Sequence, residues 1–163
     1  MASTPQATTH LPPLGTHLRE EVGNELQGIL AELVDLSLLG KQLHWSVVGP
    51  HFRPLHLMLD EFVGSWRELA DVIAERAVAI GYYPDGQARA VVSSSTLQPV
   101  IQGPLPDQVV VADLTTRLEI VAEHARERMD HLAELDAASQ DAVIEVVRAL
   151  EEQLWMIRVQ IIE

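Results

Sequence analysis

The chain has 163 residues, a formal net charge of −13 and no cysteine. Its length and 47% hydrophobic content suit one buried core, and the lack of cysteine excludes disulfides and thiolate metal sites. The negative charge disfavours contact with nucleic acid and anionic lipid and favours contact with metal cations. No apolar run reaches the roughly 18–20 residues of a membrane span, and no signal-peptide pattern opens the chain. We therefore expect a cytoplasmic protein without membrane contact.

Residues 1–17 contain three prolines, one glycine and no acidic, lysine or arginine side chain. Such a composition is typical of a flexible tail, so we expect the folded domain to span residues 18–163. Apolar residues then recur at helical spacing in four segments. These segments are residues 18–43, 55–80, 110–132 and 143–161.

The breaks between these segments predict how the helices connect. Gly49-Pro50 ends the first helix, and Pro54 is compatible only with the first turn of the second. Residues 82–107 hold four prolines, and we expect the SSST sequence at 93–96 to cap a short helix there. No alternating pattern predicts a strand. The expected fold is all-α: a four-helix bundle with a long crossover, carrying a short helix, between its second and third helices.

The second helix carries an unusual stripe of possible metal ligands. On a helical wheel Asp60, Asp71 and Glu75 fall about 40°, 60° and 100° from His56, on the side away from the apolar stripe. His56 and Asp71 are 15 residues apart, which is roughly 22 Å along a helix. No single ion can bridge that distance within one chain.

Antiparallel pairing of two copies would bring the two halves of the stripe together. His56 and Asp60 of one chain would then meet Asp71 and Glu75 of the other, with the two-fold axis near Gly64 to Arg67. His44, near the end of the first helix, could add a further ligand. Imidazole and carboxylate ligands suit Fe(II), Mn(II) or Zn(II). The alternative is a solvent-exposed polar face without bound metal.

Two motifs in this region are similar to those of the Dps proteins, the mini-ferritins of the ferritin-like superfamily. The first is His44-Trp45, Gly49, Leu55-His56 and Asp60. The second is Asp71-Val72-Ile73-Ala74-Glu75-Arg76 with Gly81, preceded by Ala70, where the family usually has a larger residue. The resemblance covers about residues 20–162 in helix order.

The resemblance implies a dodecameric shell with ferroxidase centres at its two-fold interfaces. His44, His56 and Asp60 would come from one chain and Asp71 and Glu75 from its partner, with Glu75 as the bridging carboxylate. Iron would be oxidised there, preferably by hydrogen peroxide rather than O₂. Ferric oxide would then be stored in the cavity, which protects against oxidative damage.

Several residues outside the ligand stripe are further functional candidates, and most of them have a second, structural interpretation. Trp45 is either a radical quencher beside His44 or an interface aromatic. Asp136, Asp141 and Glu145 are either favourable charges at the start of the last helix or, by the resemblance, acids lining an iron-entry pore. His10 and His17 are weaker candidates for a metal site in the tail.

Structural roles are expected for the two remaining tryptophans and for two basic residues. Trp66 and Trp155 are assigned to the core. Lys41 and Arg76 are expected to pair with carboxylates across the subunit interface rather than to take part in catalysis.

Three classes of function remain from the sequence. The first is the iron-storing ferroxidase, the second a nucleoid-compacting DNA-binding shell with secondary metal binding, and the third a helical oligomer with an unoccupied polar stripe. The tail has no lysine or arginine before Arg19, so we expect DNA binding to be weak or absent.

Overall fold

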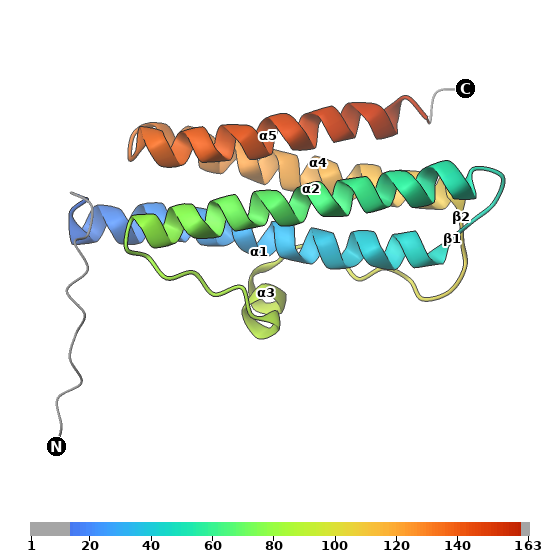
Figure 1. Ribbon diagram of the computed structural model, residues 1–163, viewed down its shortest axis with the longest axis horizontal. Helices are drawn as coiled ribbons and strands as arrows, with labels where there is room; N and C mark the ends of the chain where they lie inside the picture. The colour runs from blue at the N-terminus through green and yellow to red at the C-terminus, as the bar shows by residue number, and fades with distance from the viewer. Residues whose placement is uncertain (1–13, 161–163) are drawn as a thin grey trace, which may run out of the picture.

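The structure is a computed structural model, and it describes residues 14–160. Four long helices form the bundle, and a short helix lies in the crossover (Figure 1). The helices are α1 (Thr16–Ser46), α2 (Phe52–Ala79), α3 (Ala88–Ser94), α4 (Asp107–Ala133) and α5 (Ala137–Arg158). The expected all-α fold is therefore confirmed. Most of the predicted tail, residues 1–13, is outside the described residues. Ile161, the end of the last predicted helix, is also outside them.

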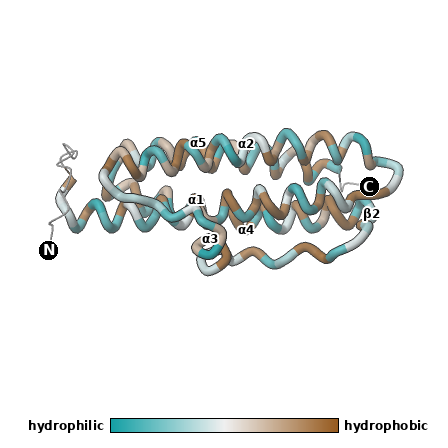
Figure 2. The backbone as a smooth tube through the Cα atoms, turned by 60° about the horizontal axis from the view of Figure 1, so that its bottom comes forward, coloured by the Kyte–Doolittle hydropathy of each residue, from teal (hydrophilic) through white to brown (hydrophobic). Residues whose placement is uncertain are grey.

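The helices pair as two antiparallel hairpins. α1 packs along α2 and α4 along α5, and the crossover passes α3 on the way between the two pairs (Figure 1). Figure 2 shows apolar residues interleaved with polar ones along each helix, as expected for amphipathic helices that share one core. The core includes Leu26, Leu33, Trp66, Ile73, Leu118 and Leu150.

Two details differ from the sequence prediction. A pair of two-residue parallel strands, β1 (Val47–Val48) and β2 (Leu105–Pro106), joins the end of α1 to the start of α4. Two residues are too few for an alternating pattern to be recognised. The SSST sequence was expected to cap α3, but it contains the C-terminal end of that helix. The N-cap of α3 is Gln87, which has no side-chain cap, and the Gln87 amide donates to Asp85 Oδ1 at 2.9 Å in the turn before the helix.

The three tryptophans have different surroundings. Trp66 is fully buried as predicted, and its Nε1 donates to Gln153 Oε1 at 2.7 Å. Trp155 is 63% exposed, so its predicted core position is wrong. Leu154 and Ile157, close to it in the sequence, are buried, and Trp155 lies on the opposite face of α5. The spacing of apolar residues alone did not show which of them face the core. Trp45 is also exposed, at 70%.

No helix within residues 14–160 is both long enough and apolar enough to cross a membrane.

Candidate metal centre

His44 and His56 lie against each other on either side of the α1–α2 loop. His44 is in the last turn of α1 and is buried, whereas His56 is in the second turn of α2 and is half-buried. Their rings stack with centroids 3.6 Å apart and planes 19° apart. The chain reversal between the helices thus places two imidazoles side by side.

Reciprocal hydrogen bonds fix the orientation of both rings. His44 Nδ1 lies 2.8 Å from the backbone oxygen of His56, and His56 Nδ1 lies 3.0 Å from the backbone oxygen of His44. Because a carbonyl oxygen can only accept, each Nδ1 carries the proton in these bonds. In the neutral form each Nε2 then keeps its lone pair, which is the usual arrangement for a metal-binding histidine whose other nitrogen donates to a carbonyl.

Asp60 lies one turn after His56 and is paired with Lys41. The ammonium group of Lys41 donates to Asp60 Oδ1, and His44 Nδ1 is 3.7 Å from the same oxygen. The hydrogen bond from Lys41 is the main reason that the pKa of Asp60 is below its usual value. Lys41 was expected to pair across the subunit interface, but its carboxylate partner belongs to the same chain. A metal ion using that oxygen would compete with the lysine.

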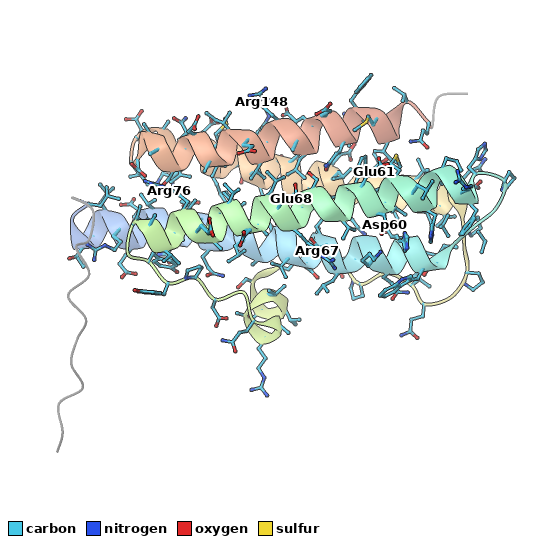
Figure 3. All side chains as sticks on the ribbon, in the orientation of Figure 1. Asp60, Glu61, Arg67, Glu68, Arg76 and Arg148 are labelled. Atoms are coloured by element: carbon cyan, nitrogen blue, oxygen red, sulfur yellow. The ribbon has the colours of Figure 1, made fainter. Side chains whose placement is uncertain are left out.

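Asp71 and Glu75 project from the other half of α2. Both are exposed, and neither has an ion pair or a side-chain hydrogen bond within residues 14–160. Asp71 lines a shallow depression of about 300 Å³ between α1 and α2, together with Arg67 and Leu38. Between the two halves, Gly64 is exposed, and a Cβ added there would meet nothing within 4 Å. Figure 3 shows the charged side chains of α2, Asp60 and Arg67 among them.

The predicted ligands do not form a complete site in one chain. No group of three or more histidine and acidic side chains within the described residues converges closely enough to hold a metal ion. The structure brings His44, His56 and Asp60 together and leaves Asp71 and Glu75 three to four turns further along α2. The five-residue ligand set therefore stays a prediction that requires a second chain.

The proposed pore acids occupy different environments at the start of α5. Asp136 is the N-cap of α5 and accepts from the Ser139 amide at 3.0 Å. Arg76 donates to the same carboxylate at 2.7 Å. Arg76 was expected to pair across the subunit interface, but its carboxylate partner belongs to the same chain. Asp141 and Glu145 are exposed. A pore role thus remains a prediction, best suited to these last two residues.

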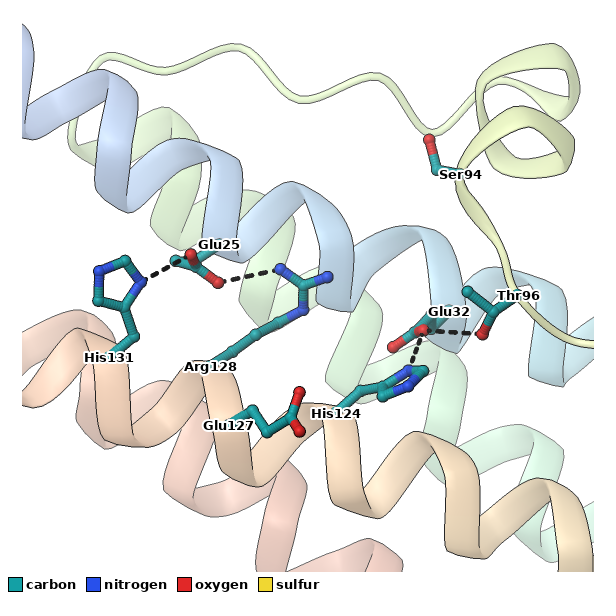
Figure 4. Close-up of a pocket in the computed structure, with 8 residues that line it drawn as sticks. All are labelled: Glu25, Glu32, Ser94, Thr96, His124, Glu127, Arg128 and His131. Atoms are coloured by element: carbon teal, nitrogen blue, oxygen red, sulfur yellow. Dashed lines mark hydrogen bonds and ion pairs between the residues drawn. The ribbon is translucent and has the colours of Figure 1, made fainter.

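A separate polar pocket of about 430 Å³ lies between α1, α4 and the segment after α3 (Figure 4). His124 Nδ1 is 2.6 Å from Glu32 Oε1, and His131 Nδ1 is 2.8 Å from Glu25 Oε1. Arg128 also donates to Glu25, at 2.9 Å. The histidines of α4 are therefore paired with acids of α1, and this pocket lacks the clustered ligands of a metal site. His17 lies in the first turn of α1, whereas His10 is outside the described residues.

The sequence interpretation missed Asp107, the first residue of α4. It is buried, and its carboxylate contacts the loop that links His44 to His56. A signal was present, since Pro106-Asp107 directly precedes a helical period and is typical of a helix start. Nothing local indicated that this side chain contacts a loop 56 residues earlier in the chain.

The four-helix topology with its long crossover is that of a ferritin-like protein. The ferritin-like domain family matches residues 23–162. The Dps of Mycobacterium smegmatis superposes with a TM-score of 0.91 at 31% identity, covering 97% of this chain and 96% of that one. DpsA14 of Streptomyces coelicolor gives 0.89 at 30% identity, covering 93% and 90%.

Curated relatives agree. The DNA protection during starvation protein of Mycolicibacterium smegmatis is 33% identical over 91% of this chain and 81% of its own length. For DNA protection during starvation protein 2 of Deinococcus radiodurans, the chain matches 63% of that relative's length at 32% identity. The chain belongs to the Dps family of the ferritin-like superfamily.

The N-cap of α5 gives a pH-dependent prediction. Burial opposes ionisation of Asp136, but the bonds from Ser139 and Arg76 outweigh it and hold the pKa of Asp136 below its usual value. Asp136→Ala should lower the free energy of unfolding by about 1 kcal/mol at pH 7. Because a lowered pKa stabilises the fold only while the carboxylate is ionised, the difference from wild type should shrink below about pH 4. Urea unfolding followed by circular dichroism measures both.

Asp141→Ala is the matched control for this prediction, since Asp141 is exposed on the same helix. It should change stability by less than about 0.5 kcal/mol. A loss for Asp136→Ala that stays constant down to pH 3 would contradict the role given to the ionised carboxylate.

Proposed function

We propose that this protein is an iron-storing ferroxidase that oxidises Fe(II) at sites shared between two subunits. The observation that carries the proposal is the stacked, reciprocally hydrogen-bonded pair of His44 and His56 beside Asp60. This arrangement leaves the Nε2 atom of each ring free of these bonds and places the Asp60 carboxylate beside His44, without completing a metal site. One subunit thus supplies half of a ligand set.

The partner supplies the other half when two α2 helices lie antiparallel. Asp71 and Glu75 of one chain then approach His56 and Asp60 of the other, and the relation repeats across the two-fold axis. Gly64 suits close approach at that axis, because it has no side chain of its own and nothing lies within 4 Å of where its Cβ would be. We propose this pairing as the repeating contact of a dodecameric shell, with Glu75 bridging the two irons.

The ligand set suits ferrous iron as substrate. Nitrogen and oxygen donors without thiolate bind Fe(II), and carboxylates can hold two ions close together. Hydrogen peroxide accepts two electrons and two ferrous ions supply one each, so paired oxidation yields ferric iron and water without hydroxyl radical. The product would be stored as ferric oxide inside the shell. A relative from Microbacterium arborescens, 25% identical, has been solved in a high iron form.

Other residues would serve entry of iron and protection of the protein. Asp141 and Glu145 are exposed acids near the start of α5, where rings of acids around a symmetry axis would attract Fe(II). Trp45 follows His44 directly and is 70% exposed. We propose that it donates an electron to any oxidant that escapes the paired reaction.

The experiment is an anaerobic Fe(II) titration followed by hydrogen peroxide, with a radical trap present. Wild type should oxidise two irons per peroxide with almost no trapped radical. The double variant His44→Ala, His56→Ala should oxidise iron at least about ten-fold more slowly, because both nitrogen ligands are lost. Ferric absorbance and the trapped-radical signal give the two readouts.

His131→Ala is the control, since this histidine is paired with Glu25 in the α1–α4 pocket. It should behave as wild type. Equal oxidation rates and equal radical yields in wild type and the His44, His56 variant would contradict the proposal, and the histidine pair would then be an interface feature only.

A DNA-compacting shell is the alternative that the names of the relatives suggest. The net charge of −13 and the lack of lysine and arginine before Arg19 disfavour it, because phosphate contacts require clustered cations. We propose weak or absent DNA binding at neutral pH. Supercoiled plasmid should keep its mobility in a low-salt gel without divalent metal, and retardation under those conditions would contradict the proposal.

A further inference from the structure

The loop between α1 and α2 determines how His44 meets His56. His44 lies two residues before α1 ends at Ser46, and His56 lies four residues after α2 begins at Phe52. The ring stacking and the two Nδ1 bonds join the ends of this loop. Any change in the path of residues 47–51 would shift one imidazole relative to the other.

The carboxylate of Asp107 holds this loop from another part of the chain. Its Oδ2 accepts from the His51 amide at 2.9 Å and lies 2.9 Å from His51 Nδ1. Its Oδ1 accepts from the Gln108 amide, also at 2.9 Å. The side chain is only 9% exposed, whereas that of His51 is 72% exposed. The Asp107 carboxylate is thus fixed in the protein interior, and the exposed loop is held in place by its hydrogen bonds to this carboxylate.

Gly49 allows the carboxylate to lie directly against the loop. Its φ is +127°, a conformation that other residues rarely adopt. A Cβ at this position would be 2.9 Å from Asp107 Cγ, which is closer than real Cβ contacts. The parallel pairing of Val47–Val48 with Leu105–Pro106 leads the two segments into this contact.

Two helix N-termini meet at the same carboxylate. α2 begins beside His51, which provides no side-chain cap, and α4 begins at Asp107 itself. A negative charge is favourable at each of these ends because their amides point towards it. The hydrogen bond from the His51 amide is the largest contribution to a pKa of Asp107 below its usual value. The side chain thus stays ionised at neutral pH.

We propose that Asp107 is a positioning residue for the metal centre, which fixes the separation of His44 and His56 through the loop that joins them. The inference rests on the proposed function, since it concerns the same pair of histidines. Asp107 would contact neither iron nor peroxide. Its effect is to hold the backbone oxygens of His44 and His56 where each can accept from the other ring.

The test uses the whole protein and Co(II) as the probe metal. Asp107→Asn replaces one of the two acceptor oxygens with an NH2 donor, which cannot accept from the amides of both His51 and Gln108. Asp107→Ser keeps one oxygen at the start of α4, on a side chain that is too short to reach His51. Both should bind Co(II) about ten-fold more weakly than wild type, with shifted visible absorption bands. Asp113→Asn is the matched control, because Asp113 is also an α4 acid that accepts a hydrogen bond, from Arg117 at 2.7 Å.

The control should keep the wild-type affinity and spectrum even where it lowers the melting temperature. If the Asp107 variants melt at a lower temperature but bind Co(II) with wild-type affinity and spectrum, Asp107 only stabilises the fold and the proposal is overturned. Asp107→Ser decides the question if Asp107→Asn fails to assemble. Equal Co(II) binding by wild type and the His44→Ala, His56→Ala variant would instead overturn the proposed function, and the positioning role with it.

Discussion

The mutual hydrogen bonding of His44 and His56 is the contact on which the site depends. Each imidazole donates to the other residue's backbone oxygen, so the ends of two antiparallel helices determine the orientation of both rings. Without these bonds the two rings could rotate, and their nitrogens could pair with water instead. Because both rings are already held in place, metal binding at the proposed site would require little further ordering of them. The loop, Gly49 and Asp107 all act on this one contact.

The net charge of this chain is unfavourable for contact with the phosphates of nucleic acid. The net charge is −13, and the only lysine, Lys41, is paired with Asp60, so the remaining cations are arginines that the acids outnumber. The same excess of acids favours cations such as Fe(II) near the surface of the protein. Lys41 also pairs with Asp60, so under the proposed function an iron ion at that carboxylate would replace one cation with another.

Helical periodicity predicted the bundle, its crossover and the burial of Trp66, because local spacing determines which face of a helix is apolar. It placed Trp155 wrongly, since Leu154 and Ile157, its near neighbours in the sequence, face the core and Trp155 lies on the other side of α5. The family resemblance of the two motifs implied that His44 and His56 belong to the same half-site. The partners of Lys41, Arg76 and Asp107 could not be predicted, because each depends on how two elements distant in sequence pack together.

The most direct test of a shared site mixes two inactive chains. His44→Ala, His56→Ala chains lack one half-site, and Asp71→Ala, Glu75→Ala chains lack the other. In a mixed two-fold pair one site carries both defects and the other is intact, so randomly mixed shells should recover about a quarter of wild-type peroxide-driven iron oxidation. Mixed shells that stay as inactive as their parents would contradict a site built from two subunits.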